Sequence, residues 1–285
     1  MFKAVKSLFL VAVLVIMAAV PVFAADGVVI KGSTTVLPIA QAAVDAYMKL
    51  HPGVQLSLSG GGSGDGIKAL IDSSTDIADS SREIKKEEIE LAKTKGVNPV
   101  ATVIAHDALT PVVNPKNKIN NLTIDQLSQI YQGNITNWKE VGGDDLPIIV
   151  ISRDSSSGTF ESWAEFVMKK AKVTPRAQML ASSGAVFTAV SKNKNAIAYI
   201  GIGYVKKGVK ALTVNGIPAT QETALSKQFP LSRELYMYTN GEPKGEAAKF
   251  IAFVKSDAGQ KLVLQEGFVP LTITKKPAAK KAVKK

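Results

Sequence analysis

Residues 153–159 read Arg-Asp-Ser-Ser-Ser-Gly-Thr and are followed at once by apolar residues with the spacing of a helix. A strand predicted over 147–152 leads into this stretch, so the chain passes here from a strand to a helix. The start of a helix offers unpaired N–H groups and the positive end of the helix dipole. Together with a guanidinium and several hydroxyls, these groups would hold an oxyanion. Taken alone, the stretch is equally compatible with an ordinary capped helix.

Three other segments carry similar chemistry. Gly32-Ser-Thr-Thr35 precedes a helix predicted from Val36, and its alternative interpretation is a plain Ser/Thr cap. The segment 60–66 holds five glycines around Ser63, so that its backbone can approach a ligand closely, although a flexible turn is the alternative. The run 76–83 predicts a short strand that ends in hydroxyls and an arginine, or a loop with a cap.

Short strands alternate with helices along most of the chain. This order predicts an α/β layer structure with a mainly parallel sheet, and its two similar halves predict two α/β lobes with a cleft between them. Strands are expected at 28–31, 54–58, 97–104, 147–152, 196–204 and 231–239, and helices at 36–50, 66–71, 85–95, 122–131, 160–172, 185–192, 243–256 and 258–266.

The N-terminus has the pattern of a secretory signal peptide over residues 1–24. Lys3 and Lys6 precede an apolar run from Leu8 to Val20, and a small-residue cleavage pattern ends at Ala24. The apolar run is shorter than the roughly 20 residues of a membrane-spanning helix. We therefore expect an exported protein that begins near residue 25 and resides in a periplasm.

The charge of the chain gives little support for a nucleic-acid partner. The formal net charge is +11, but two lysines lie within 1–24 and six within 275–285, and neither segment contains an acid. The folded part is thus only mildly basic, and no nucleic acid is expected as a partner. Residues 272–285 are predicted to form a disordered lysine-rich tail.

Several kinds of chemistry are disfavoured by residue content. The chain has no cysteine and two histidines, so it has no disulfide and no recognisable metal site, and no cofactor is expected. His106 beside Asp107 could be an acid–base pair, but a structural hydrogen bond is the favoured interpretation. A serine hydrolase is disfavoured because the chain has no Gly-x-Ser-x-Gly sequence and no serine with an evident histidine partner.

Five stretches of the sequence, taken in their order along the chain, closely resemble the periplasmic phosphate-binding proteins of ABC phosphate importers. The similar stretches run over nearly the whole mature chain to about Leu271: 32–38, 59–64, 76–84, 127–138 and 153–159. The resemblance implies a type II periplasmic-binding fold with two lobes, two crossing strands and one oxyanion in the cleft. By analogy, residues 25–106 plus 233–271 form lobe one, and residues 107–232 form lobe two.

The resemblance also implies the ligand-binding residues. Lobe one would contribute ligand-binding groups from the start of its first helix, from the glycine-rich segment 60–66 and from the end of the strand in 76–83. Lobe two would contribute them from the stretch 153–159. The expected phosphate-binding residues are Thr34, Thr35, Val36 through its amide, Ser63, Ser81, Arg153, Ser155, Ser157, Gly158 through its amide, and Thr159.

The chain departs from the family pattern at two of these positions. Well-known members carry an aspartate where Ser81 stands and another where Ser155 stands; such an aspartate accepts the proton of phosphate and repels sulfate. A serine can accept the hydrogen bond from the proton of phosphate but carries no charge. It therefore repels sulfate less, which weakens the discrimination between phosphate and sulfate. Asp79 and Asp154 lie close in sequence and are the candidates to replace it.

The resulting expectation is a monomeric, non-enzymatic carrier. It would bind inorganic phosphate with high affinity and deliver it to the membrane permease of an ABC importer after its lobes close. Two alternatives remain: a broader, sulfate-like oxyanion receptor, and a surface interaction protein of the same fold whose lysine tail grips anionic lipid or polysaccharide.

Overall fold

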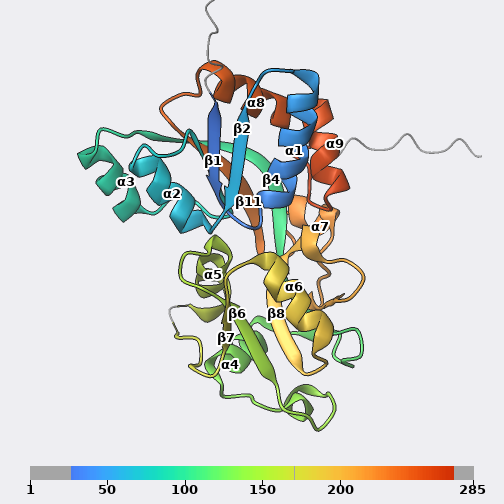
Figure 1. The fold of residues 1–285 in the computed structure, drawn as a ribbon. Helices are drawn as coiled ribbons and strands as arrows, with labels where there is room; N and C mark the ends of the chain where they lie inside the picture. The colour runs from blue at the N-terminus through green and yellow to red at the C-terminus, as the bar shows by residue number, and fades with distance from the viewer. Residues whose placement is uncertain (1–26, 170, 273–285) are drawn as a thin grey trace, which may run out of the picture.

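The computed structural model describes residues 27–169 and 171–272. The predicted signal peptide and the lysine-rich tail beyond residue 272 lie outside the described residues. The described chain forms two α/β lobes, one above the other in Figure 1.

The upper lobe is built on parallel strands that each lead into a helix. β1 pairs in parallel with β2 on one side and β3 on the other; all three strands are short, β3 is buried throughout, and β2 is largely accessible to solvent. The elements of this lobe are β1 (Val28–Gly32), α1 (Leu37–Leu50), β2 (Leu56–Gly60), α2 (Ser63–Ile71), β3 (Ile77–Ser80), α3 (Lys86–Thr94), α8 (Gly245–Lys255) and α9 (Asp257–Gln265).

Helices cover the strands of this lobe. One face of α1 packs on β1 and β3 through residues such as Ile39, Ala43 and Val44, together with residues of α8 and α9. Two smaller apolar clusters join α2 to α3, and α2 to β3 and β11. Since the chain leaves each strand at the same end, the starts of α1 and α2 both point toward the lower lobe (Figure 1).

Two long antiparallel strands connect the lobes. β4 (Pro99–Val113) pairs with β11 (Ser232–Asn240) up to Ala108, and from Leu109 onward it pairs with β8 of the lower lobe. β4 thus runs through both lobes, and the partner of this strand changes between residues 108 and 109 (Figure 1). The residue bounds of the lobes given by the family resemblance stay a prediction.

The lower lobe has its own sheet and an aromatic core. β6 pairs in parallel with β7 and β8, and the Trp163 and Tyr199 rings stack with centroids 4.3 Å apart, beside Tyr131. Its elements are β5 (Asn121–Leu122), α4 (Ile124–Gln132), η1 (Trp138–Val141), β6 (Ile149–Arg153), α5 (Gly158–Trp163), η2 (Ala164–Met168), β7 (Gln178–Leu180), α6 (Ser183–Lys192), β8 (Ala196–Gly201), η3 (Ile202–Tyr204), β9 (Lys210–Ala211), β10 (Thr213–Val214) and α7 (Gln221–Leu225).

The α/β class and the two-lobed fold are confirmed, while several element bounds differ. The strand predicted at 97–104 continues to Val113, because the polar pair His106-Asp107 is paired within the sheet instead of ending it. The helix predicted at 160–172 is α-helical only to Trp163, continues as one π-type segment and stops at Lys169, which has a left-handed backbone conformation. The end of the strand predicted at 196–204 is a 3₁₀ turn from Ile202.

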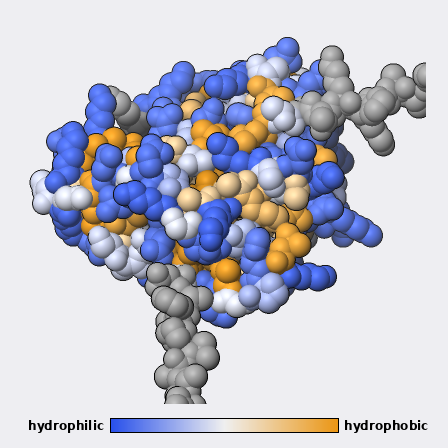
Figure 2. Space-filling view, turned by 90° about the horizontal axis from the view of Figure 1, so that it is seen from above, coloured by the Kyte–Doolittle hydropathy of each residue, from blue (hydrophilic) through white to orange (hydrophobic). Residues whose placement is uncertain are grey.

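The surface of the upper lobe is mixed in character. Figure 2, which looks down on this lobe, shows hydrophilic residues interspersed with groups of apolar ones. No helix in the described part of the chain is long and apolar enough to cross a membrane.

We predict that Gly66→Ala destabilises the protein by about 1–3 kcal/mol. A Cβ at Gly66 in α2 would lie 2.6 Å from the Cα of Gly32 and from the carbonyl oxygen of Lys31, both backbone atoms of β1. The measurement is the free energy of unfolding in urea.

The matched control is Gly184→Ala in α6, where the nearest atom to the new Cβ is 4.0 Å away. It should be neutral or stabilising by up to about 1 kcal/mol, since alanine favours a helix. Equal losses for both variants would contradict the packing of α2 on β1.

Candidate oxyanion site

The upper lobe contributes hydroxyls from the starts of α1 and α2 and from the end of β3. Thr34 and Thr35 lie just before α1, where the Val36 amide donates to Ser33 Oγ at 3.3 Å. Ser63 is the first residue of α2, and its Oγ lies 3.3 Å from Ser81 Oγ. All these side chains are buried. Strand-to-helix connections therefore bring the separate sequence segments to one edge of the sheet.

The lower lobe contributes Arg153 from the end of β6 and the start of α5. Ser157 caps α5 by accepting a hydrogen bond from the Phe160 amide at 3.2 Å, which orients the first amides of the helix. Gly158 and Thr159 follow in its first turn and are buried. A Cβ at Gly158 would lie 2.3 Å from Ser63 Oγ, so only glycine lets α5 approach the upper lobe this closely.

Arg153 is a buried positive charge of this region, with a side chain only 2% exposed. Its Nε donates to the Leu180 carbonyl at 2.9 Å and its Nη2 to the Ala181 carbonyl at 3.0 Å, while Nη1 reaches Ser183 Oγ at 3.4 Å. Burial lowers the pKa of the guanidinium from its ordinary value, with a partial offset from Asp154. The group nevertheless stays charged, since an arginine keeps its proton in proteins. A buried cation of this kind favours a nearby anion.

The hydroxyls of the two lobes contact one another. Thr35 Oγ1 lies 2.8 Å from Thr159 Oγ1, and the Ser183 amide donates to Thr34 Oγ1 at 3.3 Å. The Gly64 amide also donates to the Ser156 carbonyl across the lobes at 2.9 Å. Each hydroxyl can donate or accept, so the same groups can turn toward an oxyanion.

Nine of the ten expected residues thus lie around one point between the lobes, and Ser155 does not. Ser155 is exposed in the loop before α5. The neighbouring Asp154 is turned back on this loop: its Oδ1 accepts from the Ser156 amide at 3.0 Å and from Ser156 Oγ at 2.7 Å. The expected binding role of Ser155 is therefore not supported by its position, because the turn that Asp154 organises points the serine outward.

The two candidate replacement acids have different surroundings. Asp79 in β3 is buried, its Oδ1 has no hydrogen-bond partner within residues 27–169 and 171–272, and burial raises its pKa well above the ordinary value. A carboxyl with such a pKa tends to keep its proton and therefore carries less charge. Asp154 Oδ2 lies 3.8 Å from Arg153 Nη2 and likewise has no hydrogen-bond partner in the described part of the chain. Asp154 is therefore the acid placed to act on an anion at Arg153.

His106 and Asp107 do not pair with each other. Asp107 is fully buried and forms an ion pair with Arg233 of β11, with 2.8 Å between Oδ2 and Nη2. His106 is partly buried and lines a cavity; burial lowers its pKa. Asp107 therefore has a structural contact, as the favoured interpretation of the sequence expected. Its partner, however, is Arg233 and not His106, and the sequence did not single out this arginine.

An ion-pair cluster also joins the lobes. Arg82 binds Glu88 of α3 with Nη2–Oε1 and Nη1–Oε2 distances of 2.7 and 2.8 Å, and it pairs through Nε with Glu161 of α5 in the other lobe. Lys85 Nζ lies 2.9 Å from the second oxygen of Glu161. Arg82 is only 8% exposed, so this contact is well shielded from solvent.

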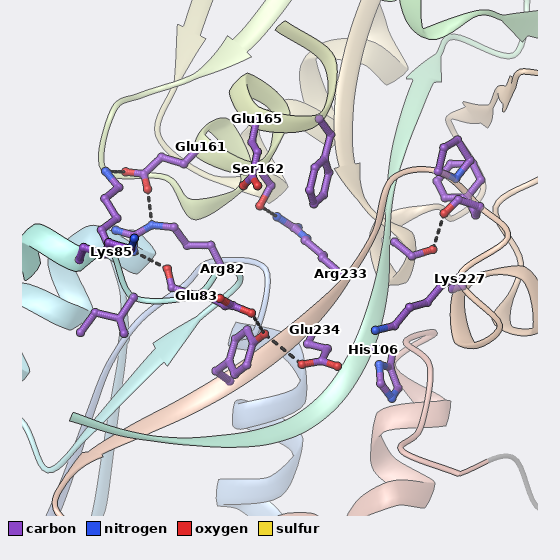
Figure 3. Close-up of a pocket in the computed structure, with 18 residues that line it drawn as sticks. Arg82, Glu83, Lys85, His106, Glu161, Ser162, Glu165, Lys227, Arg233 and Glu234 are labelled. Atoms are coloured by element: carbon purple, nitrogen blue, oxygen red, sulfur yellow. Dashed lines mark hydrogen bonds and ion pairs between the residues drawn. The ribbon is translucent and has the colours of Figure 1, made fainter. Parts of the chain in front are cut away.

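A cavity of about 750 Å³ lies beside the hydroxyl cluster, between the lobes and the crossing strands. Figure 3 shows Arg82 and Glu161 on one side of it, Arg233 and Ser162 next to α5, and His106, Lys227 and Glu234 along the strands. Its lining mixes acids and bases and thus favours neither sign of ligand charge. Among the described residues, no three His, Asp or Glu side chains are grouped to hold a metal ion.

Sequence reasoning missed two residues next to the hydroxyl cluster. Ser183 belongs to the Ser182-Ser183-Gly184 start of α6, and the same cap signal that drew attention to Gly158 could have found it. Arg233 lies inside a strand and has no local motif, so only the sheet register brings it near Thr159.

The comparisons with known proteins agree with this geometry. Residues 22–258 match the model of a PBP superfamily domain. The phosphate-binding protein PstS of Borreliella burgdorferi is 37% identical over 252 residues, which cover 84% of this chain and 88% of that protein.

Solved structures are similar as well. A putative phosphate ABC transporter substrate-binding protein from Clostridium perfringens, solved with bound phosphate, has a TM-score of 0.81 and 36% identity, covering 87% of this chain and all of that one. An ABC-type phosphate transport receptor from Vibrio cholerae has a TM-score of 0.70 and 34% identity, covering 85% of this chain and 99% of that one. The chain therefore belongs to the PBP superfamily and, within it, to the family of phosphate-binding proteins of phosphate ABC transporters.

Proposed function

We propose that this protein binds one inorganic phosphate between its lobes and delivers it to an ABC transporter. The observation that carries the proposal is the buried Arg153 guanidinium, surrounded by hydroxyls and helix starts from both lobes. Phosphate offers four oxygens that accept hydrogen bonds, and charge-assisted bonds to arginine are among the strongest. The phosphate-bound relative from Clostridium perfringens, similar over the whole of its length, supports this ligand.

The wider setting follows from the same proposal. We infer that the protein acts as a monomer in the periplasm, after removal of residues 1–24, and that a membrane permease recognises its closed form. The relatives described above are named as phosphate-binding and substrate-binding proteins, which supports a carrier over an enzyme. Nothing in the mildly basic composition calls for a nucleic-acid partner.

Selectivity for phosphate over sulfate is the finer part of the proposal. Ser81 can accept the proton of phosphate, and so can Asp154 Oδ2, which has no hydrogen-bond partner among the described residues; to sulfate, which has no proton to donate, the Asp154 carboxylate offers only repulsion. Without such a charge, the site would be a broader oxyanion receptor.

We predict tight one-to-one binding of phosphate and at least about 100-fold weaker binding of sulfate at pH 7.5. The measurement is calorimetric titration of the mature protein after removal of any bound anion. Asp154→Asn should narrow this difference by about tenfold, because it removes a carboxylate that can accept the proton of phosphate and that repels sulfate. Equal affinities for the two anions in the unmodified protein would indicate the broader receptor, and no response to either would contradict the proposed function.

We predict that Arg153→Lys weakens phosphate binding by about 100-fold or more. The substitution removes the planar guanidinium that would donate to phosphate, and it leaves the carbonyls of Leu180 and Ala181 without their present donors. The same titration measures this effect. Arg176→Lys, at an exposed position of the same lobe, is the matched control and should bind as the unmodified protein does. A small effect of Arg153→Lys with an intact fold would place the ligand elsewhere.

We predict that Glu161→Gln weakens phosphate binding by about three- to tenfold, because closure no longer gains the ion pairs to Arg82 and Lys85. Added salt should shrink the difference between the two proteins. Glu165→Gln, one turn further along, is the control, since Glu165 has no ion pair among the described residues. Equal effects of both substitutions would argue against a role for the Arg82 cluster in closure.

A further inference from the structure

The pair formed by Asp107 and Arg233 sits where the two crossing strands meet. The residues face each other directly in the β4–β11 register, and both are buried. Arg233 Nε lies 2.9 Å from Asp107 Oδ2, and the other oxygen of Asp107 accepts from the Ile202 amide at 2.8 Å. The carboxylate, which belongs to β4, is thus held by Arg233 of β11 and by a backbone amide of the lower lobe.

The free edge of the Arg233 guanidinium points to α5. Its Nη2 donates to Thr159 Oγ1 at 3.2 Å and its Nη1 to Ser162 Oγ at 3.4 Å (Figure 3 shows the contact with Ser162). Both hydroxyls in turn reach the upper lobe: Thr159 Oγ1 lies 2.8 Å from Thr35 Oγ1, and Ser162 Oγ lies 3.5 Å from the Ser81 carbonyl. Arg233 therefore stands directly behind two contacts across the lobes.

This contact fixes what the Thr159 hydroxyl can do. A guanidinium has donors only, whereas a hydroxyl has one hydrogen and two lone pairs. Because Arg233 occupies a lone pair of Thr159, the hydroxyl hydrogen is left for an acceptor on the other side. An unprotonated oxygen of a bound oxyanion needs this orientation, since such an oxygen can only accept a hydrogen bond.

Arg233 also differs from Arg153 in charge balance. Arg233 is paired with Asp107, while Arg153 has only the longer 3.8 Å contact with Asp154. The positive charge of Arg233 contributes to lowering the pKa of Arg153, so the two guanidinium groups influence each other. Arg153 can thus neutralise a ligand directly, and Arg233 is placed to act through Thr159.

We propose that Arg233, held by Asp107, is a positioning residue that keeps the Thr159 hydroxyl turned as a donor toward the bound oxyanion. The inference rests on the proposed phosphate function and deepens it. It links the crossing strands to the ligand, because the same guanidinium is fixed by both strands and orients a ligand-binding group.

The test is a double-mutant cycle with phosphate titrated by calorimetry. Arg233→Lys keeps a positive charge beside Asp107 but loses the fork that reaches Thr159. The effect of Arg233→Lys on phosphate affinity is measured in three backgrounds: the unmodified protein, Thr159→Val, which has no hydroxyl, and Thr159→Ser, which keeps the hydroxyl. The midpoint of thermal unfolding is recorded for each protein, and Arg176→Lys serves as the control.

We expect Arg233→Lys to weaken phosphate binding by about tenfold in the unmodified protein and in Thr159→Ser, but by less than about twofold in Thr159→Val. A similar loss in all three backgrounds would overturn the inference, since Arg233 would then act through the fold alone. No effect in the unmodified protein, with the midpoint of unfolding retained, would overturn it as well. Failure of the unmodified protein to bind phosphate would instead refute the proposed function.

Discussion

The burial of the Arg153 charge is the constraint on which the binding region depends. A guanidinium removed from water needs acceptors, and the Leu180 and Ala181 carbonyls bond to two of its nitrogens without neutralising its charge. The surrounding hydroxyls and helix amides can orient around an anion, and the nearby Asp154 carboxylate lies 3.8 Å from Arg153 Nη2. The region is therefore complementary to one small anion. This complementarity requires that the starts of α1, α2, α5 and α6, which supply the hydroxyls and amides, meet at one place.

The two buried arginines near this point show how charge pairing separates structure from binding. Arg233 is neutralised by Asp107, and the pair holds the crossing strands together. Arg153 is held by backbone carbonyls and keeps its charge available. The same side-chain type thus supports the frame in one place and leaves a charge available for the proposed ligand in the other, because an acid is close to Arg233 and more distant from Arg153.

The distribution of apolar and polar contacts explains how such a protein can open and close. Each lobe has its own large apolar core, one around α1, α8 and β11 and the other around Trp163 and Tyr199. The contacts described between the lobes near the site are hydroxyl pairs and the Arg82–Glu161 ion pair, which water or a ligand can replace. Movement of the lobes therefore exchanges polar contacts and leaves the two apolar cores intact.

The sequence by itself determined the alternation of strands and helices, the family and nine residues that gather at the site, because helix caps, glycines and apolar periodicity are local signals. It misjudged β4, where polar His106 and Asp107 interrupt the apolar pattern, and it grouped Ser155 with residues from which the turn around Asp154 points it away. Only the tertiary structure decided that Asp107 pairs with Arg233, that Arg82 reaches Glu161, and that Ser183 joins the site. These contacts join residues 79 to 149 positions apart, and no local pattern specifies which distant partner a buried charge or hydroxyl will meet.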